Sequence, residues 1–182
     1  MGGGMWGVGF AIVDMRIRKL LKRFLATPMR RSDFLIGMMI SRLLFMIPEF
    51  LLLLVFARFA FGVSSVGGYL PVAVLILLGS IQFAGIGLLV ASRASTIETV
   101  SGLMNLVMLP MWVLSGVFFS AERFPEVVQP AIKLLPLTAM NDALRAVMLE
   151  GKTLLEVGRE IGILAAWGLS SFAIALKIFR WQ

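Results

Sequence analysis

Arg42 and Glu49 are the two side chains of this sequence best placed for chemistry in an apolar environment. They are seven residues apart, which is two helical turns and about 20° from eclipsed, so a helix would present both on one face. An isolated charge in hydrocarbon costs at least ~2.5 kcal/mol, so such groups are paired or face a cavity. We interpret them as intramembrane polar candidates. Snorkelling of Arg42, with Glu49 satisfied by a neighbouring helix, is favoured over direct contact with a substrate.

The composition excludes most other chemistry. The chain has no cysteine and no histidine, which excludes disulfides, thiolate or imidazole metal sites and serine–histidine pairs. Asp14, Asp33 and Asp142 all fall outside the apolar spans, which argues against an intramembrane aspartyl protease. Two apparent phosphate loops, at 2–7 and 151–153, lack the strand or the glycine-rich turn that such loops need. We therefore expect no catalytic residue, no metal site and no cofactor bound by this chain.

The composition is that of an integral membrane protein. Hydrophobic residues make up 59% of the chain and charged residues 15%, and the mean hydropathy is +0.96. The pattern predicts an all-α, multi-pass fold. Residues 1–13 are too short to cross the bilayer, so they are interpreted as the inner end of a partial span, with an unstructured glycine-rich start as the alternative. Four full transmembrane helices are predicted, at 34–61, 69–91, 99–119 and 158–179.

Small and polar residues predict how these spans begin and pack. Ser32 or Asp33 is expected to cap the first full span. In the second span, glycines would let another helix approach closely, and in the last span a small-residue pair gives a weaker indication of the same kind. The glycines concerned are Gly79, Gly85 and Gly87 in the second span, and Gly158 with Gly162 in the last.

Residues 14–31 form a basic amphipathic segment. Its apolar side chains recur at helical spacing along one stripe: Ile17, Leu20, Leu21, Phe24 and Leu25. Thr27 and Pro28 are expected to end this helix. Part of its charge is explained as positive residues lying on anionic lipid, and an apolar stripe between two membrane segments is not typical of a nucleic-acid arm. Docking of a cytoplasmic partner fits best, because the stripe needs something to cover it.

Residues 120–157, between the third and fourth full spans, predict two short amphipathic helices. The first is expected to have Pro125 in its first turn. The second follows Pro136, with Thr138 as its cap, and ends at Gly151. An ordinary loop is the alternative, but amphipathic helices so close to the end of a span favour an interfacial or re-entrant position.

Positive residues give the predicted orientation. Seven lysines and arginines lie within 14–31, and Arg93, Lys177 and Arg180 fall on the same side of the alternating spans. The positive-inside rule makes that side cytoplasmic, with the C-terminus there and residues 120–157 outside. The predicted location is the cell (inner or plasma) membrane, with membrane lipid as a contact and no nucleic acid as a partner.

Two runs of the sequence carry a family resemblance. One is L-S-G-V-F-F-S-A-E-R-F-P from Leu114 to Pro125, followed by L-P-L-T-A-M-N-D-A-L-R from Leu135 to Arg145. The other is L-L-K-R-F-L-A-T-P-M-R-R-S-D-F at 20–34. The chain resembles the ABC-2 permeases, the transmembrane subunits of type 2 ATP-binding-cassette exporters. It departs from that family's Glu-Arg-Glu-x-Gly-Thr-like run, since it has D-M-R-I-R-K before the second motif.

The resemblance covers the last two-thirds or so of a six-span permease and makes residues 1–13 the inner end of span two, so the first span has no counterpart here. It implies a permease subunit of an exporter, not itself an enzyme, that moves a lipid, drug-like or polysaccharide substrate out of the cytoplasm. The implied partners are a cytoplasmic ATPase subunit, which binds ATP and Mg²⁺, and a second permease subunit forming a homodimer or heterodimer. A secondary transporter or channel component using Arg42 and Glu49, and a non-transporting membrane scaffold, stay open as alternatives.

The resemblance also implies two groups of site residues. The residues of the coupling helix that would dock the ATPase are Ile17, Lys19, Leu20, Lys22, Arg23, Phe24, Thr27 and Pro28. The candidates for an extracytoplasmic gate are Ser115, Gly116, Phe118, Phe119, Glu122, Pro125, Pro136, Thr138, Asp142 and Arg145. The docking group would transmit the conformational change driven by ATP hydrolysis, and the gate group would release the substrate outside.

Overall fold

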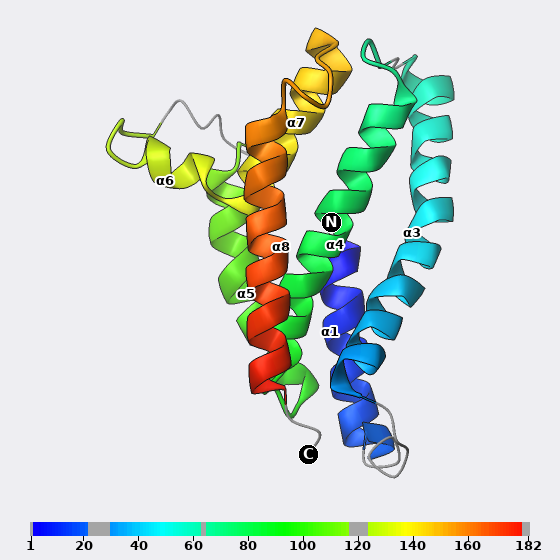
Figure 1. Ribbon diagram of the computed structural model, residues 1–182, viewed down its shortest axis with the longest axis vertical. Coiled ribbons are helices and arrows are strands. Elements are labelled where there is room, and N and C mark those ends of the chain that lie inside the picture. Colours follow the sequence, from blue (N-terminus) through cyan, green and yellow to red (C-terminus); the bar gives the residue numbers. More distant parts are fainter. Residues whose placement is uncertain (1, 22–29, 63–64, 117–123, 180–182) are drawn as a thin grey trace. The chain divides into compact units, whose positions relative to one another are not determined.

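The computed structural model describes residues 2–21, 30–62, 65–116 and 124–179, and the regular structure in these ranges is helical, without a strand. The predicted all-α fold is confirmed. The helices, labelled in Figure 1, are α1 (Gly2–Ile17), α3 (Arg31–Phe61), α4 (Tyr69–Ala91), α5 (Ile97–Leu114), α6 (Gln129–Lys133), α7 (Pro136–Glu150) and α8 (Gly158–Ile178).

Within the described ranges, four helices are long and apolar enough to cross a membrane: α3, α4, α5 and α8. The bounds of α4 coincide with the predicted span at 69–91. Because α3 already begins at Arg31, Ser32 and Asp33 lie in its first turn and the prediction that one of them caps it is wrong. Asp33 still places negative charge near the positive end of the helix dipole.

The third span ends earlier than predicted. α5 stops at Leu114, not at 119, and Gly116 takes the left-handed conformation (φ 78°) that commonly follows the end of a helix. The last hydrogen bond of the helical type runs from the backbone N–H of Ser115 to the carbonyl of Met111 (2.9 Å). The gate candidates Phe118, Phe119 and Glu122 lie outside the described residues.

α1 runs through the expected boundary at residue 14 and ends at Ile17. Lys19 then takes a left-handed conformation (φ 58°), which costs an L-residue roughly 1–2 kcal/mol and cannot continue a helix. The prediction of one unbroken helix across the start of 14–31 is therefore wrong, because the chain turns after Ile17. The docking candidates Lys22, Arg23, Phe24, Thr27 and Pro28 lie outside the described residues.

The two helices after α5 begin at different residues than predicted. α6 starts at Gln129 with Pro130 in its first turn, so Pro125 lies in the preceding segment. α7 starts at Pro136, whose missing N–H suits the first helical position, and Thr138 is inside the helix instead of capping it. Gly151 ends α7 in a left-handed conformation (φ 69°), as predicted.

The chain divides into two compact units. The first draws on Met1–Glu49, Ser80–Asn105 and Gly168–Gln182, and the second on Phe50–Gly79 and Leu106–Trp167. Within the second unit, the apolar face of α7 is buried against residues of α4 and α8, so α7 is a packed element and not a free loop. This core consists of Val72, Leu75, Ala139, Met140, Ala143, Ala146, Val147, Val157 and Leu164.

In the first unit, glycines of α4 allow two close helix contacts. A Cβ atom on Gly87 would lie 2.5 Å from the carbonyl oxygen of Met5 in α1, and one on Gly85 would lie 3.3 Å from that of Gly168 in α8. No side chain would fit at Gly87 without moving backbone. The predicted role of these glycines in close helix approach is confirmed.

In the second unit, Gly79 of α4 makes the third predicted close contact. A Cβ atom there would lie 2.8 Å from the sulfur of Met140 in α7. By contrast, a Cβ atom on Gly158 or Gly162 would meet no described atom within 4 Å. The expectation that this pair marks a helix contact is wrong within the described chain.

Candidate functional site

Arg16, in the last turn of α1, binds the end of α4. Its guanidinium donates hydrogen bonds to the carbonyl oxygens of Ala91 (3.1 Å), Ser92 (3.0 Å) and Ala94. Carbonyls at the C-terminal end of a helix lack helical partners and carry the negative end of its dipole. A cation placed there satisfies them, so Arg16 joins α1 to the turn between α4 and α5. We call these contacts the Arg16 clasp.

Two buried aromatic rings complete the surroundings of Arg16. Its guanidinium carbon lies 6.0 Å from the ring centroid of Phe179, within cation–π range. The Phe179 ring is in turn 6.1 Å from that of Phe34, near the start of α3. Arg16 therefore connects α1, the α4–α5 turn and the chain just after α8 within the first unit. Arg16 is one of the seven basic residues within 14–31, and its place in the sequence did not predict this role.

The described docking candidates follow directly on the clasp. Ile17 is 50% exposed, Lys19 is exposed and Leu20 is half-buried, whereas Leu21 is buried. The turn at Lys19 thus divides the predicted apolar stripe, and Leu21 packs into the first unit. Ile17 and Lys19 remain accessible to a partner.

Arg42 and Glu49 meet on α3. The Nη2 atom of Arg42 lies 3.6 Å from the Oε2 atom of Glu49. The Arg42 guanidinium rests against two glycines of α1: a Cβ on Gly3 would collide with it, and one on Gly7 would lie 3.2 Å from its central carbon. The structure therefore brings the two predicted polar candidates together, with the Arg42 guanidinium against two glycines of α1 that leave room for it.

The gate candidates of the second unit are partly brought together. The side-chain amide of Asn141 in α7 donates to the carbonyl of Ser115, after α5 (3.4 Å). The hydroxyls of Ser115 and Thr138 are buried, and neither has a hydrogen-bond partner among the described residues. Pro136 is buried as well, whereas Pro125 is exposed. Ser115 is thus linked to α7 by a hydrogen bond, whereas no described contact joins Pro125 to Ser115 or to α7.

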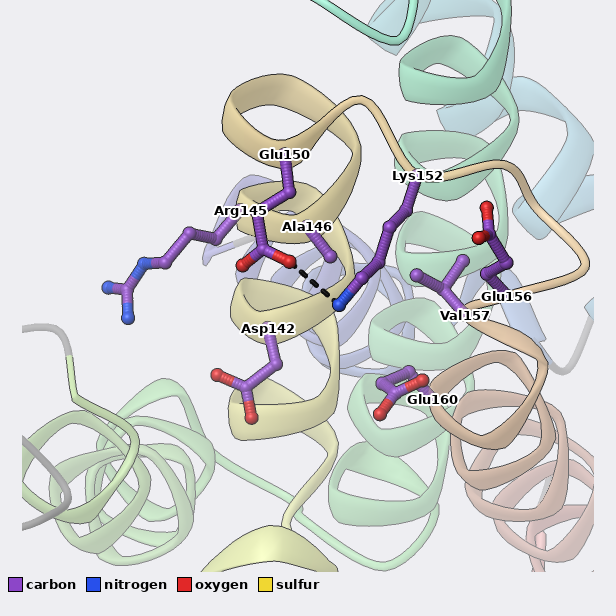
Figure 2. Close-up of a pocket in the computed structure, with 8 residues that line it drawn as sticks. All are labelled: Asp142, Arg145, Ala146, Glu150, Lys152, Glu156, Val157 and Glu160. Carbon is purple, nitrogen blue, oxygen red and sulfur yellow. Dashed lines mark ion pairs between the residues drawn. The ribbon is translucent and has the colours of Figure 1, made fainter.

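Asp142 and Arg145 line a charged cavity of about 300 Å³ at the end of α7. Figure 2 shows Lys152 extending across it to pair with Glu150 (2.7 Å), while Arg145 points away. The residues that line it are Asp142, Arg145, Ala146, Glu150, Lys152, Glu156, Val157 and Glu160.

Two of the charged groups that line this cavity, Asp142 and Lys152, have raised pKa values. Removal of water by surrounding protein raises the pKa of Asp142; the charge of Arg145 opposes this effect, and that of Glu160 adds to it. The hydrogen bond and the charge of Glu150 raise the pKa of Lys152. Lys152 therefore stays positive, and Asp142 holds its proton at a higher pH than an ordinary aspartate.

Glu156 is stabilised as an anion by the residue three positions before it. Its Oε2 atom accepts hydrogen bonds from the backbone N–H (2.7 Å) and the hydroxyl (2.8 Å) of Thr153. These bonds lower the pKa of Glu156. The Thr-x-x-Glu spacing is that of a capping box, of which only the half in which the glutamate accepts from the threonine N–H forms here, so this contact is readable in the sequence.

The chemistry that these groups can perform is binding and positioning. Across the described ranges, no group of three histidine, cysteine, aspartate or glutamate side chains is arranged to hold a metal ion. The constellations present are a cation on helix carbonyls, an ion pair against glycines and a charged cavity.

Comparisons with known proteins agree with this kind of molecule. A family model described as ABC-2 type transporter matches residues 4–149. The linearmycin resistance permease protein LnrN of Bacillus subtilis is 26% identical over 176 residues, which are 97% of this chain and 46% of that protein. Nodulation protein J of Rhizobium meliloti is 32% identical over 105 residues, 58% of this chain and 40% of that protein. The chain thus spans less than half the length of these curated relatives. No solved structure matches it significantly.

Proposed function

This chain belongs to the ABC-2 type transporter family, and on that basis we propose that it serves as a membrane-spanning permease subunit of an ATP-binding-cassette exporter. In this proposal the chain provides the passage and the coupling. ATP, with Mg²⁺, is bound and hydrolysed by a separate cytoplasmic ATPase subunit. A second permease subunit, identical or different, completes the transmembrane part.

The proposed orientation places the end of α1, the α4–α5 turn and the C-terminus on the cytoplasmic side of the cell membrane, because the basic residues gather there. The substrate is a lipid, a drug-like molecule or a polysaccharide that leaves the cytoplasm. The Bacillus subtilis relative is named a resistance permease, which favours a drug-like substrate.

The Arg16 clasp is the observation that carries the coupling part of this proposal. The accessible residues Ile17 and Lys19 come directly after Arg16, and the clasp holds that end of α1 on the α4–α5 turn. Charge-assisted hydrogen bonds are short and strong, so displacement of the docking residues would pass to the turn and into α4 and α5. A flexible connection would lose that displacement.

The test is charge reversal of the proposed docking residues Lys19, Lys22 and Arg23 to glutamate, in cells that also produce a candidate ATP-binding-cassette ATPase subunit. We expect the ATPase to stop co-purifying with the permease and substrate-stimulated hydrolysis to be lost, because three attractive charges become repulsive.

The matched control reverses three basic residues outside the docking segment, Arg58, Lys133 and Arg159, which are exposed. Co-purification should survive in this control. Unchanged co-purification and hydrolysis in the docking variant would contradict the coupling proposal.

A further inference from the structure

A second, smaller cavity lies between α1 and α3 in the first unit. Its volume is about 240 Å³, and its lining is largely apolar with one cation and no carboxylate. The residues that line it are Gly7, Val8, Ala11, Met38, Ser41, Arg42 and Phe45. Such a mixture suits a ligand that is anionic at one point and apolar elsewhere.

The cation, Arg42, is only partly satisfied by the protein. Its Nε atom is buried and has no hydrogen-bond partner among the described residues. Its Nη2 atom is 3.6 Å from Glu49, well beyond the roughly 2.7–2.9 Å of a charge-assisted hydrogen bond. A guanidinium is a planar fork of donors that matches the oxygens of a carboxylate or a phosphate. Arg42 therefore has donor capacity left for an anion.

The direction of Arg42 supports a binding role. A long cationic side chain in a membrane helix ordinarily extends to the nearer interface. Arg42 instead extends toward Glu49, which is farther from the start of α3 at Arg31. Ionisable groups held at such a depth face a cavity or a pathway, because isolated charge in hydrocarbon is costly.

Glycine in α1 makes the space for this arrangement. A Cβ atom on Gly7 would lie 3.2 Å from the Nε atom and the central carbon of the Arg42 guanidinium. A larger side chain at Gly7 would fill the cavity without changing its charge. The cavity therefore depends on this one residue for its room and on Arg42 for its charge.

The apolar part of a ligand has a surface to follow. Phe45 both lines the cavity and is 69% exposed, and Ile40 and Leu44 on the same helix are exposed too. The cavity is smaller than the roughly 300–1,000 Å³ of sites that enclose a drug-sized ligand. It would hold a head group and the first carbons of a chain, with the rest lying along α3.

We propose that this cavity binds the anionic head of an amphipathic molecule, a phosphate or carboxylate on an apolar chain, with Arg42 as its counter-ion. The inference rests on the proposed export function, because it names amphipathic anions as the substrate class. When such a head enters, its oxygens take the free donors of Arg42 and compete with Glu49 for the guanidinium.

The experiment measures binding to the purified full chain in a neutral maltoside detergent by isothermal titration. Three probes separate the components of the ligand: dodecyl phosphate, dodecyltrimethylammonium and inorganic phosphate. We expect dodecyl phosphate to bind at least about tenfold more tightly than either other probe, because only it offers both the anionic head and the chain. Equal binding of the cationic amphiphile, or of inorganic phosphate, would overturn the proposal.

Two pairs of variants locate the site. Arg42→Gln removes the charge and Gly7→Leu removes the space, and each is expected to weaken dodecyl phosphate binding by about tenfold or more. The matched controls are Arg58→Gln, on the same helix, and Gly37→Leu, where a Cβ atom would meet no described atom within 4 Å. Both controls should bind as the unaltered chain does. Unchanged affinity in Arg42→Gln or in Gly7→Leu would overturn the assignment.

Failure of this inference is distinguishable from failure of the proposed function. A chain that co-purifies with its ATPase and exports substrate, but binds no dodecyl phosphate, would overturn the inference alone. A chain that binds dodecyl phosphate through Arg42 and never associates with an ATPase would support the site and contradict the export function.

Discussion

Asp142 and Glu156 are carboxylates of the same cavity, yet their surroundings shift their pKa values in opposite directions. Partial burial, with the negative charge of Glu160 adding to it and the positive charge of Arg145 opposing it, raises the pKa of Asp142, so its charged form is disfavoured. Glu156 accepts two hydrogen bonds from Thr153, so its charged form is favoured. Folding of this part of the chain therefore has two opposing dependences on pH.

The variants Asp142→Asn and Glu156→Gln should reveal these opposing dependences. The folded pKa of Asp142 lies above its unfolded value, so its contribution is fully present below the unfolded pKa and is lost as pH rises through the folded pKa. The folded pKa of Glu156 lies below its unfolded value, so its contribution is present above the unfolded pKa and is lost as pH falls through the folded one.

The measurement is the thermal unfolding midpoint in detergent at constant ionic strength, from about pH 3 to pH 7, a window that spans the ordinary carboxyl pKa values. The midpoint of the unaltered chain minus that of Asp142→Asn should fall as pH rises, and the difference from Glu156→Gln should rise. Each variant serves as the control for the other. Two differences that change in the same sense would contradict the environments described above.

Helix α4 shows what sequence could and could not predict about the elements. Its bounds and the close contacts of its glycines were predictable, because a long uncharged apolar run and a missing side chain have direct consequences. The end of α1 before Lys19 and the start of α7 before Thr138 were not predictable from the sequence. At the start of α7, Pro136 and Thr138 are both good starting signals, and the structure begins the helix at the proline while burying the threonine. Burial and packing decided between signals of similar strength.

Gly87→Ala tests the contact between α4 and α1. The added Cβ would lie 2.5 Å from the carbonyl oxygen and 3.0 Å from the Cα of Met5, both backbone atoms that cannot rotate away. We expect a loss of about 1–3 kcal/mol in the free energy of unfolding, as for overpacking of a core. Chemical denaturation in mixed micelles, followed by tryptophan fluorescence, measures it.

Gly102→Ala is the matched control, because a Cβ at that position in α5 would meet no described atom within 4 Å. Helix propensity predicts a gain of up to about 1 kcal/mol there. If both alanine variants changed stability equally, the close approach of α1 to Gly87 would be wrong.

In the proposed function, this chain passes a movement from the surface that meets the ATPase to the helices that surround the substrate. Coupling of that kind requires a contiguous physical connection that has more than one arrangement. The basic segment was recognisable in the sequence, but the Arg16 clasp was not. Its acceptors are backbone carbonyls, and that of Ala91 is 75 residues away in the sequence. Side-chain types do not indicate which distant backbone group a residue will contact. The Arg16 clasp, which we propose transmits the movement, is therefore visible only in the folded structure.

Arg16→Gln should reduce transport by the proposed exporter while leaving the association of its subunits intact. Glutamine has no charge for the end of the α4 dipole and cannot reach three carbonyls, and each buried acceptor left unsatisfied costs about 1–3 kcal/mol, so the clasp would open. The proposed docking residues Ile17 and Lys19 are unchanged, so under the proposed function the ATPase should still co-purify and hydrolyse ATP. Substrate moved per ATP, measured in proteoliposomes, should fall about tenfold or more, the effect of losing one such contact.

Arg16→Lys should recover part of this transport, because it restores the charge but not the planar fork of donors. The control is Arg18→Gln, which removes an exposed pair with Asp14 (2.9 Å) worth at most ~1 kcal/mol and should leave transport near its original level. Equal losses of co-purification and transport in Arg16→Gln would make the residue a general stabiliser of the fold. Full transport per ATP in Arg16→Gln would mean that the Arg16 clasp does not transmit the movement of the docking residues to α4 and α5. The rest of the basic segment at 14–31 would then have to make that connection.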